Sequence, residues 1–175
     1  ACVGVFAVLL ISTLFKGRKR IIYNRDSTRE YLVRYYLFLK DRKNCYATGI
    51  DCCEKALKIA KTNVKLHQIE NRIKIFKSDV DNFNTGKYDL IISNPPYIDK
   101  HQLKYLGVSE FEPCKALNGG ENGTEILRRV IIKASQLLKT NGKLIIEIGN
   151  NQKYKVINLL NNSNLEEFPK NELQN

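Results

Sequence analysis

The sequence contains no methionine and no tryptophan, and only 2 of its 175 residues are histidines, His67 and His101. We place His67 at a helix end and His101 in a loop, so the two do not form a catalytic pair. The sequence shows no Ser-His-Asp arrangement and no cluster of metal ligands. The sequence therefore predicts no metal site and no histidine-driven nucleophilic catalysis.

The cysteines show no CxxC spacing, and their number is odd. The 5 residues are Cys2, Cys45, Cys52, Cys53 and Cys114. Adjacent side chains such as Cys52 and Cys53 cannot easily bind one zinc ion together. We interpret all of them as reduced thiols, which predicts a cytoplasmic protein.

No apolar run is long enough to cross a membrane. The longest one, residues 1–15, is followed by the basic residues 16–20. A membrane-spanning helix needs ~20 apolar residues, and a signal peptide carries its basic residues before the apolar region. We therefore expect no membrane contact, and we interpret this run as a buried strand or helix, or as a scrambled start of the domain.

The net charge is +11 and the pI is about 9.4. Such a balance has two explanations: a nucleic acid or ribonucleoprotein partner, or a coding bias toward lysine, asparagine and isoleucine. The lysines are scattered and form no basic stripe with interleaved aromatic residues, which favours the second explanation. We leave proximity to the ribosome or RNA open and expect no specific DNA binding, since so short a chain offers no extra region for base readout.

From residue 45 onward, apolar segments of strand length alternate with amphipathic segments of helix length. The predicted strands are 45–51, 72–79, 88–93 and 143–149, and the predicted helices are 54–67, 124–139 and 151–160. The 124–139 helix is expected to end at Asn141-Gly142. This alternation predicts βαβ units and a mostly parallel sheet in an α/β domain over residues 45–165. An atypical segment, 1–44, holding a degenerate or displaced first strand or helix, would precede it, and a polar tail, 166–175, would follow.

Two acidic residues end predicted strands. Asp51 would accept hydrogen bonds from ribose hydroxyls in a nucleotide-binding sheet, or would cap the helix that follows it. Asp79 would lie near an adenine amino group, or would be a solvated loop acid beside Asp81. Each of these acids ends a strand that precedes the strand 88–93 in the sequence. Such an ordered constellation is hard to obtain by chance.

The strand 88–93 leads into Asn94-Pro95-Pro96-Tyr97. The prolines fix φ and lack an N–H, and Asn94 offers both a carbonyl acceptor and an amide donor. A stiff loop rich in acceptors suits the binding of a planar –NH2 group. The alternative is a plain turn at a strand end. Glu147, late in an apolar strand, is interpreted as a structural partner of this loop because a buried carboxylate needs one.

Three stretches, YDLIISNPPYID, FEPCKALNGGENG and NGKLIIEIGNNQ, resemble the HemK-type methyltransferases. These enzymes methylate the N5 nitrogen of the glutamine in the GGQ motif of peptide chain release factors. The resemblance extends upstream and covers residues 45–160. It implies a Rossmann-like class I fold, S-adenosylmethionine as cofactor and release factors as partners. Adenine-N6 DNA methyltransferases share NPPY, whereas the FEPxxALxGGxNG stretch is more specific.

The resemblance also implies roles for single residues. Asp51 matches the acid that binds the cofactor ribose, and the pair Asp79 and Val80 matches the adenine site. Asn94 would contact cofactor and substrate, and the residues from Asn94 through Pro95 and Pro96 to Tyr97 would bind the substrate glutamine. No general base is implied.

The family's glycine-rich cofactor turn has no counterpart at the expected place, since the window 26–39 contains no glycine. The nearest candidate is Gly4. Together with the family's missing helical domain and last strands, this predicts a fold that is incomplete at both ends. The alternatives are a glutamine methyltransferase, a non-catalytic remnant of one, and an enzyme acting on a ribosomal protein glutamine or a nucleic acid adenine.

Overall fold

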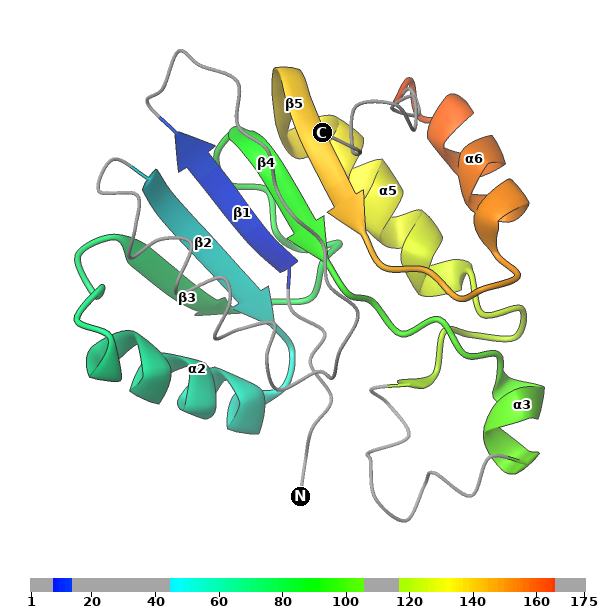
Figure 1. The fold of residues 1–175 in the computed structure, drawn as a ribbon, viewed down its shortest axis with the longest axis horizontal. Coiled ribbons are helices and arrows are strands. Elements are labelled where there is room, and N and C mark those ends of the chain that lie inside the picture. The colour runs from blue at the N-terminus through cyan, green and yellow to red at the C-terminus, as the bar shows by residue number, and fades with distance from the viewer. Residues whose placement is uncertain (1–7, 14–44, 106–116, 166–175) are drawn as a thin grey trace, which may run out of the picture.

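One sheet organises the computed structural model, which describes residues 8–13, 45–105 and 117–165 (Figure 1). Its order is β3-β2-β1-β4-β5. The strands are β1 Val8–Thr13, β2 Cys45–Asp51, β3 Ile73–Lys77, β4 Tyr88–Ser93 and β5 Leu138–Ile146. The helices are α2 Glu54–Leu66, α3 Lys100–Tyr105, α5 Glu125–Leu137 and α6 Lys153–Asn161.

The predicted mostly parallel α/β sheet is confirmed, with one reversed strand at its centre. β2 is parallel to β3 and β4 is parallel to β5, whereas β1 runs antiparallel to both of its neighbours, β2 and β4. The order 3-2-1-4-5 is that of doubly wound nucleotide-binding sheets. The carboxyl ends of β2, β3, β4 and β5 therefore meet at one edge of the sheet, which we call the carboxyl edge.

Helices cover both faces of the sheet, with α2 on one face and α5 and α6 on the other (Figure 1). Successive β4 side chains point to opposite faces, as the strand period requires. Ile91 joins the apolar cluster that contains Val130 of α5, whereas Leu90 and Ile92 join the cluster that contains Val64 of α2. β4 is thus buried on both sides, which explains its continuous apolar sequence.

The predicted bounds of β2 and β4 are confirmed, and α2 buries Ala56, Leu57, Ala60 and Val64. The predicted boundary between α5 and β5 is wrong. The helix ends at Leu137 rather than at residue 139, and Leu138 already pairs with Tyr88 in the sheet. The β4–β5 register then shifts, and Asn141, with φ of 63°, lies in this irregular stretch rather than at the helix end. Leu137 and Leu138 are both buried, so the hydrophobic pattern does not show where the helix ends and the strand begins.

Two further elements differ from the expectations. The loop expected around His101 contains the short helix α3, whose start is capped by the Asp99 carboxylate, an acceptor for the Gln102 N–H at 2.8 Å. Of the expected N-terminal strand or helix, residues 8–13 form β1. The rest of 1–44 and the predicted tail 166–175 lie outside the described residues. None of the helices that the structure describes is both long and apolar enough to span a bilayer.

Ile131 and Ile132 of α5 provide a matched test of this packing, because Ile131 is fully buried and Ile132 is 40% exposed. We expect Ile131→Ala to lower the free energy of unfolding by about 2–5 kcal/mol, through lost burial and a new cavity. Ile132→Ala should cost less than about 1 kcal/mol. Urea denaturation followed by circular dichroism measures both, and equal losses would contradict the orientation of α5.

Candidate functional site

Polar side chains gather at the carboxyl edge, where ligands bind in open α/β sheets. Asp51 ends β2, Asp79 follows β3, Asn94 follows β4 and Glu147 follows β5. The sequence prediction placed Asp51, Asp79 and Asn94 at strand ends, and the strand order brings their strands to one edge. Because β1 is reversed, its first residue, Val8, also lies at this edge, paired with Ile50 and Ser93.

Asp51 is a buried carboxyl group, with 4% of the residue exposed. One oxygen accepts the Cys53 N–H at 2.6 Å. Burial raises the pKa of Asp51 to about 7, and the Cys53 hydrogen bond only partly offsets this. Cys53 rather than Asp51 is the N-cap residue of α2, so the capping alternative does not describe this position. Hydrogen-bond donors of a ligand would stabilise the charged form of such a carboxyl group.

Asp79 is held by an arginine that the sequence analysis did not identify. The Asp79 carboxylate accepts the Asp81 N–H at 3.1 Å and pairs with the guanidinium group of Arg129 in α5. The Nε of Arg129 donates to Asp81 at 2.6 Å. Asp79 is therefore part of an ion-paired cluster with Asp81 and Arg129. These side chains are 35–52% exposed, so each pair contributes at most about 1 kcal/mol.

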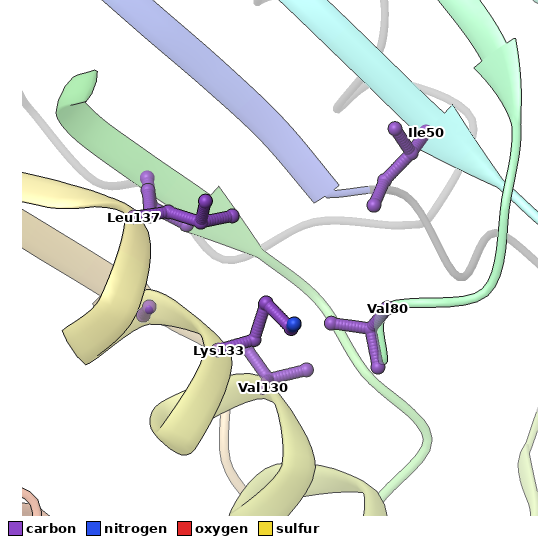
Figure 2. A pocket seen from close by; sticks show the side chains of 7 residues that line it. Ile50, Val80, Val130, Lys133 and Leu137 are labelled. Atoms are coloured by element: carbon purple, nitrogen blue, oxygen red, sulfur yellow. The ribbon is translucent and has the colours of Figure 1, made fainter. Parts of the chain in front are cut away.

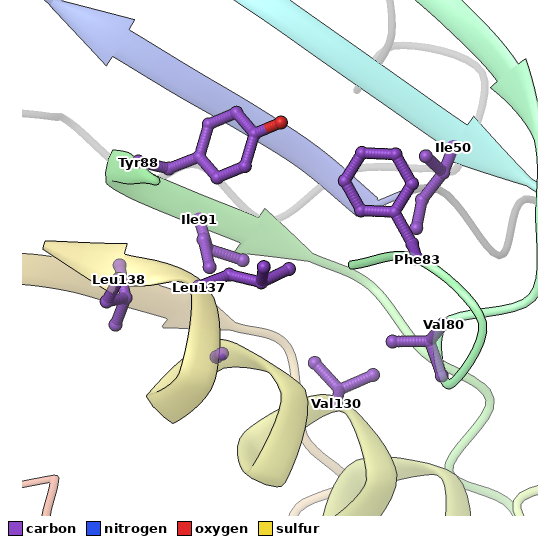
Figure 3. Close-up of a cluster of buried hydrophobic side chains, with 9 residues drawn as sticks. Ile50, Val80, Phe83, Tyr88, Ile91, Val130, Leu137 and Leu138 are labelled. Atoms are coloured by element: carbon purple, nitrogen blue, oxygen red, sulfur yellow. The ribbon is translucent and has the colours of Figure 1, made fainter. Parts of the chain in front are cut away.

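The Val80 side chain points into the core rather than toward the carboxyl edge. It lines a cavity of about 10 Å³ with Ile50, Val130 and Lys133 (Figure 2). It also belongs to the apolar cluster between the sheet and α5 (Figure 3). A cavity of this size holds at most one water molecule. Any contact of Val80 with a ligand at the edge must therefore use its backbone.

The loop Asn94–Tyr97, which we call the acceptor loop, is followed by backbone hydrogen bonds to a distant segment. Ile98 N–H donates to the Leu117 carbonyl at 3.0 Å, and Gly119 N–H donates to the Ile98 carbonyl at 2.8 Å. Lys100 N–H donates to Gly120 at 3.0 Å. Residues 117–125, which we call the glycine segment, thus lie beside the acceptor loop. Pro95 and Pro96 are both buried.

Glycines permit the close approach of these two segments. A Cβ on Gly119 would lie 2.8 Å from the Tyr97 Cα and 2.9 Å from the Pro96 oxygen. A Cβ on Gly123, where φ is +72°, would lie 2.6 Å from the Tyr97 oxygen. Glu125 closes the segment by accepting the Asn122 and Thr124 N–H groups at 3.1 Å each. Burial raises the pKa of Glu125, but these hydrogen bonds outweigh it and leave the pKa lowered.

Tyr97 is tied to the carboxyl end of β5 through Glu147, as predicted. Its hydroxyl donates to Glu147 Oε1 at 3.1 Å, and Glu147 N–H donates to the Ser93 carbonyl at 3.0 Å. Glu147 Oε2 and Ser93 Oγ are buried without a hydrogen-bond partner in the described part of the chain. Such unsatisfied oxygen atoms at the ends of strands are able to accept a hydrogen bond from a ligand or a water molecule.

Gln152 is a second residue that sequence reasoning missed. It is 9% exposed, and its Nε2 donates to the Tyr97 carbonyl at 2.8 Å and to the Gly123 carbonyl at 2.9 Å. Its Oε1 accepts the Gly149 N–H at 3.0 Å. The only sequence signal was its place at the end of the NGKLIIEIGNNQ stretch. Gly4 lies outside the described residues, and within those residues no cluster of three potential metal ligands occurs.

Comparisons with known proteins find methyltransferases. Residues 36–112 match the family "Methyltransferase small domain". The ribosomal protein uL3 glutamine methyltransferase of Francisella tularensis is 41% identical over 107 residues, which are 60% of this chain and 34% of that protein. The release factor glutamine methyltransferase of Thermodesulfovibrio yellowstonii is 35% identical over 113 residues, which are 63% of this chain and 40% of that protein.

Over the matched residues, the chain is therefore similar to proteins named glutamine methyltransferases. A bifunctional methyltransferase of Rickettsia typhi is also similar, with 37% identity over 122 residues, which are 68% of this chain and 24% of that protein. The chain spans between about a quarter and two fifths of the length of the relatives it matches. The resemblance and the class I methyltransferase fold are thus confirmed.

Gly123 tests the contact between the acceptor loop and the glycine segment. We expect Gly123→Ala to lower the free energy of unfolding by more than about 1 kcal/mol, through the clash with Tyr97 and the positive φ. Gly49→Ala is the control, since its Cβ would lie 3.8 Å from Ile75, an ordinary contact. Thermal denaturation measures both, and an equal effect would contradict the close approach.

The pKa of Asp51 predicts a stability difference that depends on pH. Because the folded pKa, about 7, exceeds the ordinary value of 3.8, the wild type loses stability as pH rises from about 4 to about 7. Asp51→Asn keeps an acceptor for the Cys53 N–H and removes this loss. We expect the variant's gain in unfolding free energy to grow over this range, by up to about 1.4 kcal/mol per pKa unit, and then level off. A gain independent of pH would contradict the burial of the carboxyl group.

Proposed function

We propose that this chain provides the catalytic region for S-adenosylmethionine-dependent methylation of a glutamine side-chain nitrogen, with the GGQ glutamine of peptide chain release factors as substrate. The observation that supports this most is the acceptor loop at the carboxyl edge, beside the glycine segment. The relatives named release factor glutamine methyltransferases support the choice of substrate. The identity of this chain with those relatives covers only part of their length.

The residues at the edge fit the groups that the cofactor presents. The buried Asp51 carboxyl group suits the hydroxyl donors of a ribose, which would satisfy its oxygens and lower its pKa. Asp79 would reach an adenine amino group only by sharing or releasing Arg129. When bound, the cofactor supplies an electrophilic methyl group on a sulfonium.

The acceptor loop would make the amide nitrogen reactive by position. An amide nitrogen is a weak nucleophile because its lone pair is delocalised into the carbonyl. The side-chain oxygen of Asn94 and the carbonyl of Pro95 would accept its two N–H groups and hold the nitrogen in line with the methyl group. Much of the rate gain is then positional, with acceptors placed where positive charge develops. The Tyr97 ring would pack against the flat face of the amide.

A glutamine of ribosomal protein uL3 is the second candidate substrate. The specific observation is the 41% identity to the Francisella tularensis protein that carries this name. The edge geometry serves either glutamine equally, because the acceptors recognise the amide group alone. The choice between the two proteins must therefore come from contacts outside the acceptor loop.

The test is methyl transfer to a purified release factor and to purified uL3, read by mass spectrometry of their glutamine peptides. We expect the GGQ glutamine to gain a methyl group and Asn94→Ala to lower the rate on the order of 100-fold. Asn71→Ala, an exposed position, is the matched control. Modification of uL3 alone would support the second candidate. No transfer by folded protein to either would contradict the proposal and support a non-catalytic remnant.

A further inference from the structure

We propose that Gln152 is a positioning residue that fixes the backbone of Tyr97 and, through it, the geometry of the acceptor loop. This inference rests on the proposed function, because it assigns Gln152 a role in the same site. The structure assigns the role through one side-chain amide that joins three separate parts of the chain. These parts are the acceptor loop, the glycine segment and the turn between β5 and α6.

The amide of Gln152 can adopt only one orientation in this contact. Its Nε2 donates its two N–H groups to the carbonyls of Tyr97 and Gly123, at 2.8 and 2.9 Å. Its Oε1 accepts the N–H of Gly149 at 3.0 Å. A flipped amide would place its oxygen against two carbonyls and its NH2 against an N–H group. The position is therefore specific for glutamine by donor and acceptor count as well as by size.

Gln152 and Glu147 hold opposite ends of Tyr97. Glu147 accepts the ring hydroxyl at 3.1 Å, and Gln152 binds the main-chain carbonyl. The two residues before Tyr97 are prolines, whose fixed φ angles transmit a backbone displacement instead of absorbing it. A shift of the Tyr97 carbonyl should therefore reach the Asn94 side chain, and a misplacement of about 1 Å in a catalytic group can cost on the order of 100-fold in rate.

Two variants separate positioning from simple packing. Gln152→Met keeps the approximate shape and removes all three hydrogen bonds. Gln152→Glu keeps the acceptor for Gly149 N–H, but its second oxygen faces the Tyr97 and Gly123 carbonyls unless it carries a proton. Gln136→Met is the matched control, because it makes the same chemical change at an exposed position of α5.

We expect Gln152→Met to lower kcat for glutamine methylation on the order of 100-fold, with KM for the cofactor changed less than about 3-fold. Gln152→Glu should regain activity relative to wild type as pH falls, since the protonated form donates one hydrogen bond. Dividing by the wild-type profile removes the pH effects that both proteins share, including those of the other carboxyl groups at the site, Asp51 and Glu147. An unchanged kcat in Gln152→Met, or no pH-dependent recovery in Gln152→Glu, would overturn the proposal.

Hydrogen exchange keeps the test independent of activity. The N–H groups of Ile98 and Gly119 bond across the two segments, so we expect both to exchange at least 10-fold faster in Gln152→Met and at the wild-type rate in Gln136→Met. Unchanged exchange at these groups would overturn the proposal. If wild-type protein transfers no methyl group while these groups exchange faster in Gln152→Met, the proposed function fails and the positioning of the loop by Gln152 stands.

Discussion

The two prolines after β4 impose the constraint on which the site depends. Pro95 and Pro96 have no N–H, so half of the four residues in the loop that carries Asn94 cannot donate a backbone hydrogen bond. Three other segments bond to the loop or to the residue after it: the glycine segment bonds to Ile98, Glu147 accepts the Tyr97 hydroxyl, and Gln152 donates to the Tyr97 carbonyl. Each support reaches the loop from a different part of the sequence. The neighbouring segments hold the loop at Tyr97, whose hydroxyl and carbonyl are both bonded.

The reversed central strand changes how the chain approaches this loop. In a fully parallel sheet the turn after the first strand would lie at the carboxyl edge. Here the last residue of β1, Thr13, pairs with Cys45 at the opposite edge, and its first residue, Val8, lies between Ile50 and Ser93. The first residue of β1, not its last, therefore lies at the carboxyl edge.

Local patterns predicted the elements well and the contacts between them poorly. β2, β4 and α2 were foreseen because buried runs and a helical stripe are properties of neighbouring residues. The Asn94 and Asp51 positions followed from strand ends. The α5–β5 boundary failed because Leu137 and Leu138 are both apolar and buried, so no change of period separated helix from strand. Arg129 and Gln152 were missed for a different reason. Their partners lie about 50 residues away in sequence, and only the folded sheet brings them together.

The most direct test of the account is titration calorimetry of S-adenosylmethionine into the purified chain, compared with Asp51→Ala. The account places the ribose acceptor and the acceptor loop at one carboxyl edge, so it predicts affinity on the order of micromolar, about −8 kcal/mol, for the wild type. Removal of the Asp51 carboxyl group should weaken binding at least 10-fold while the variant stays folded. No measurable heat from folded wild type, or equal affinity in Asp51→Ala, would contradict the assignment of this edge as the cofactor site.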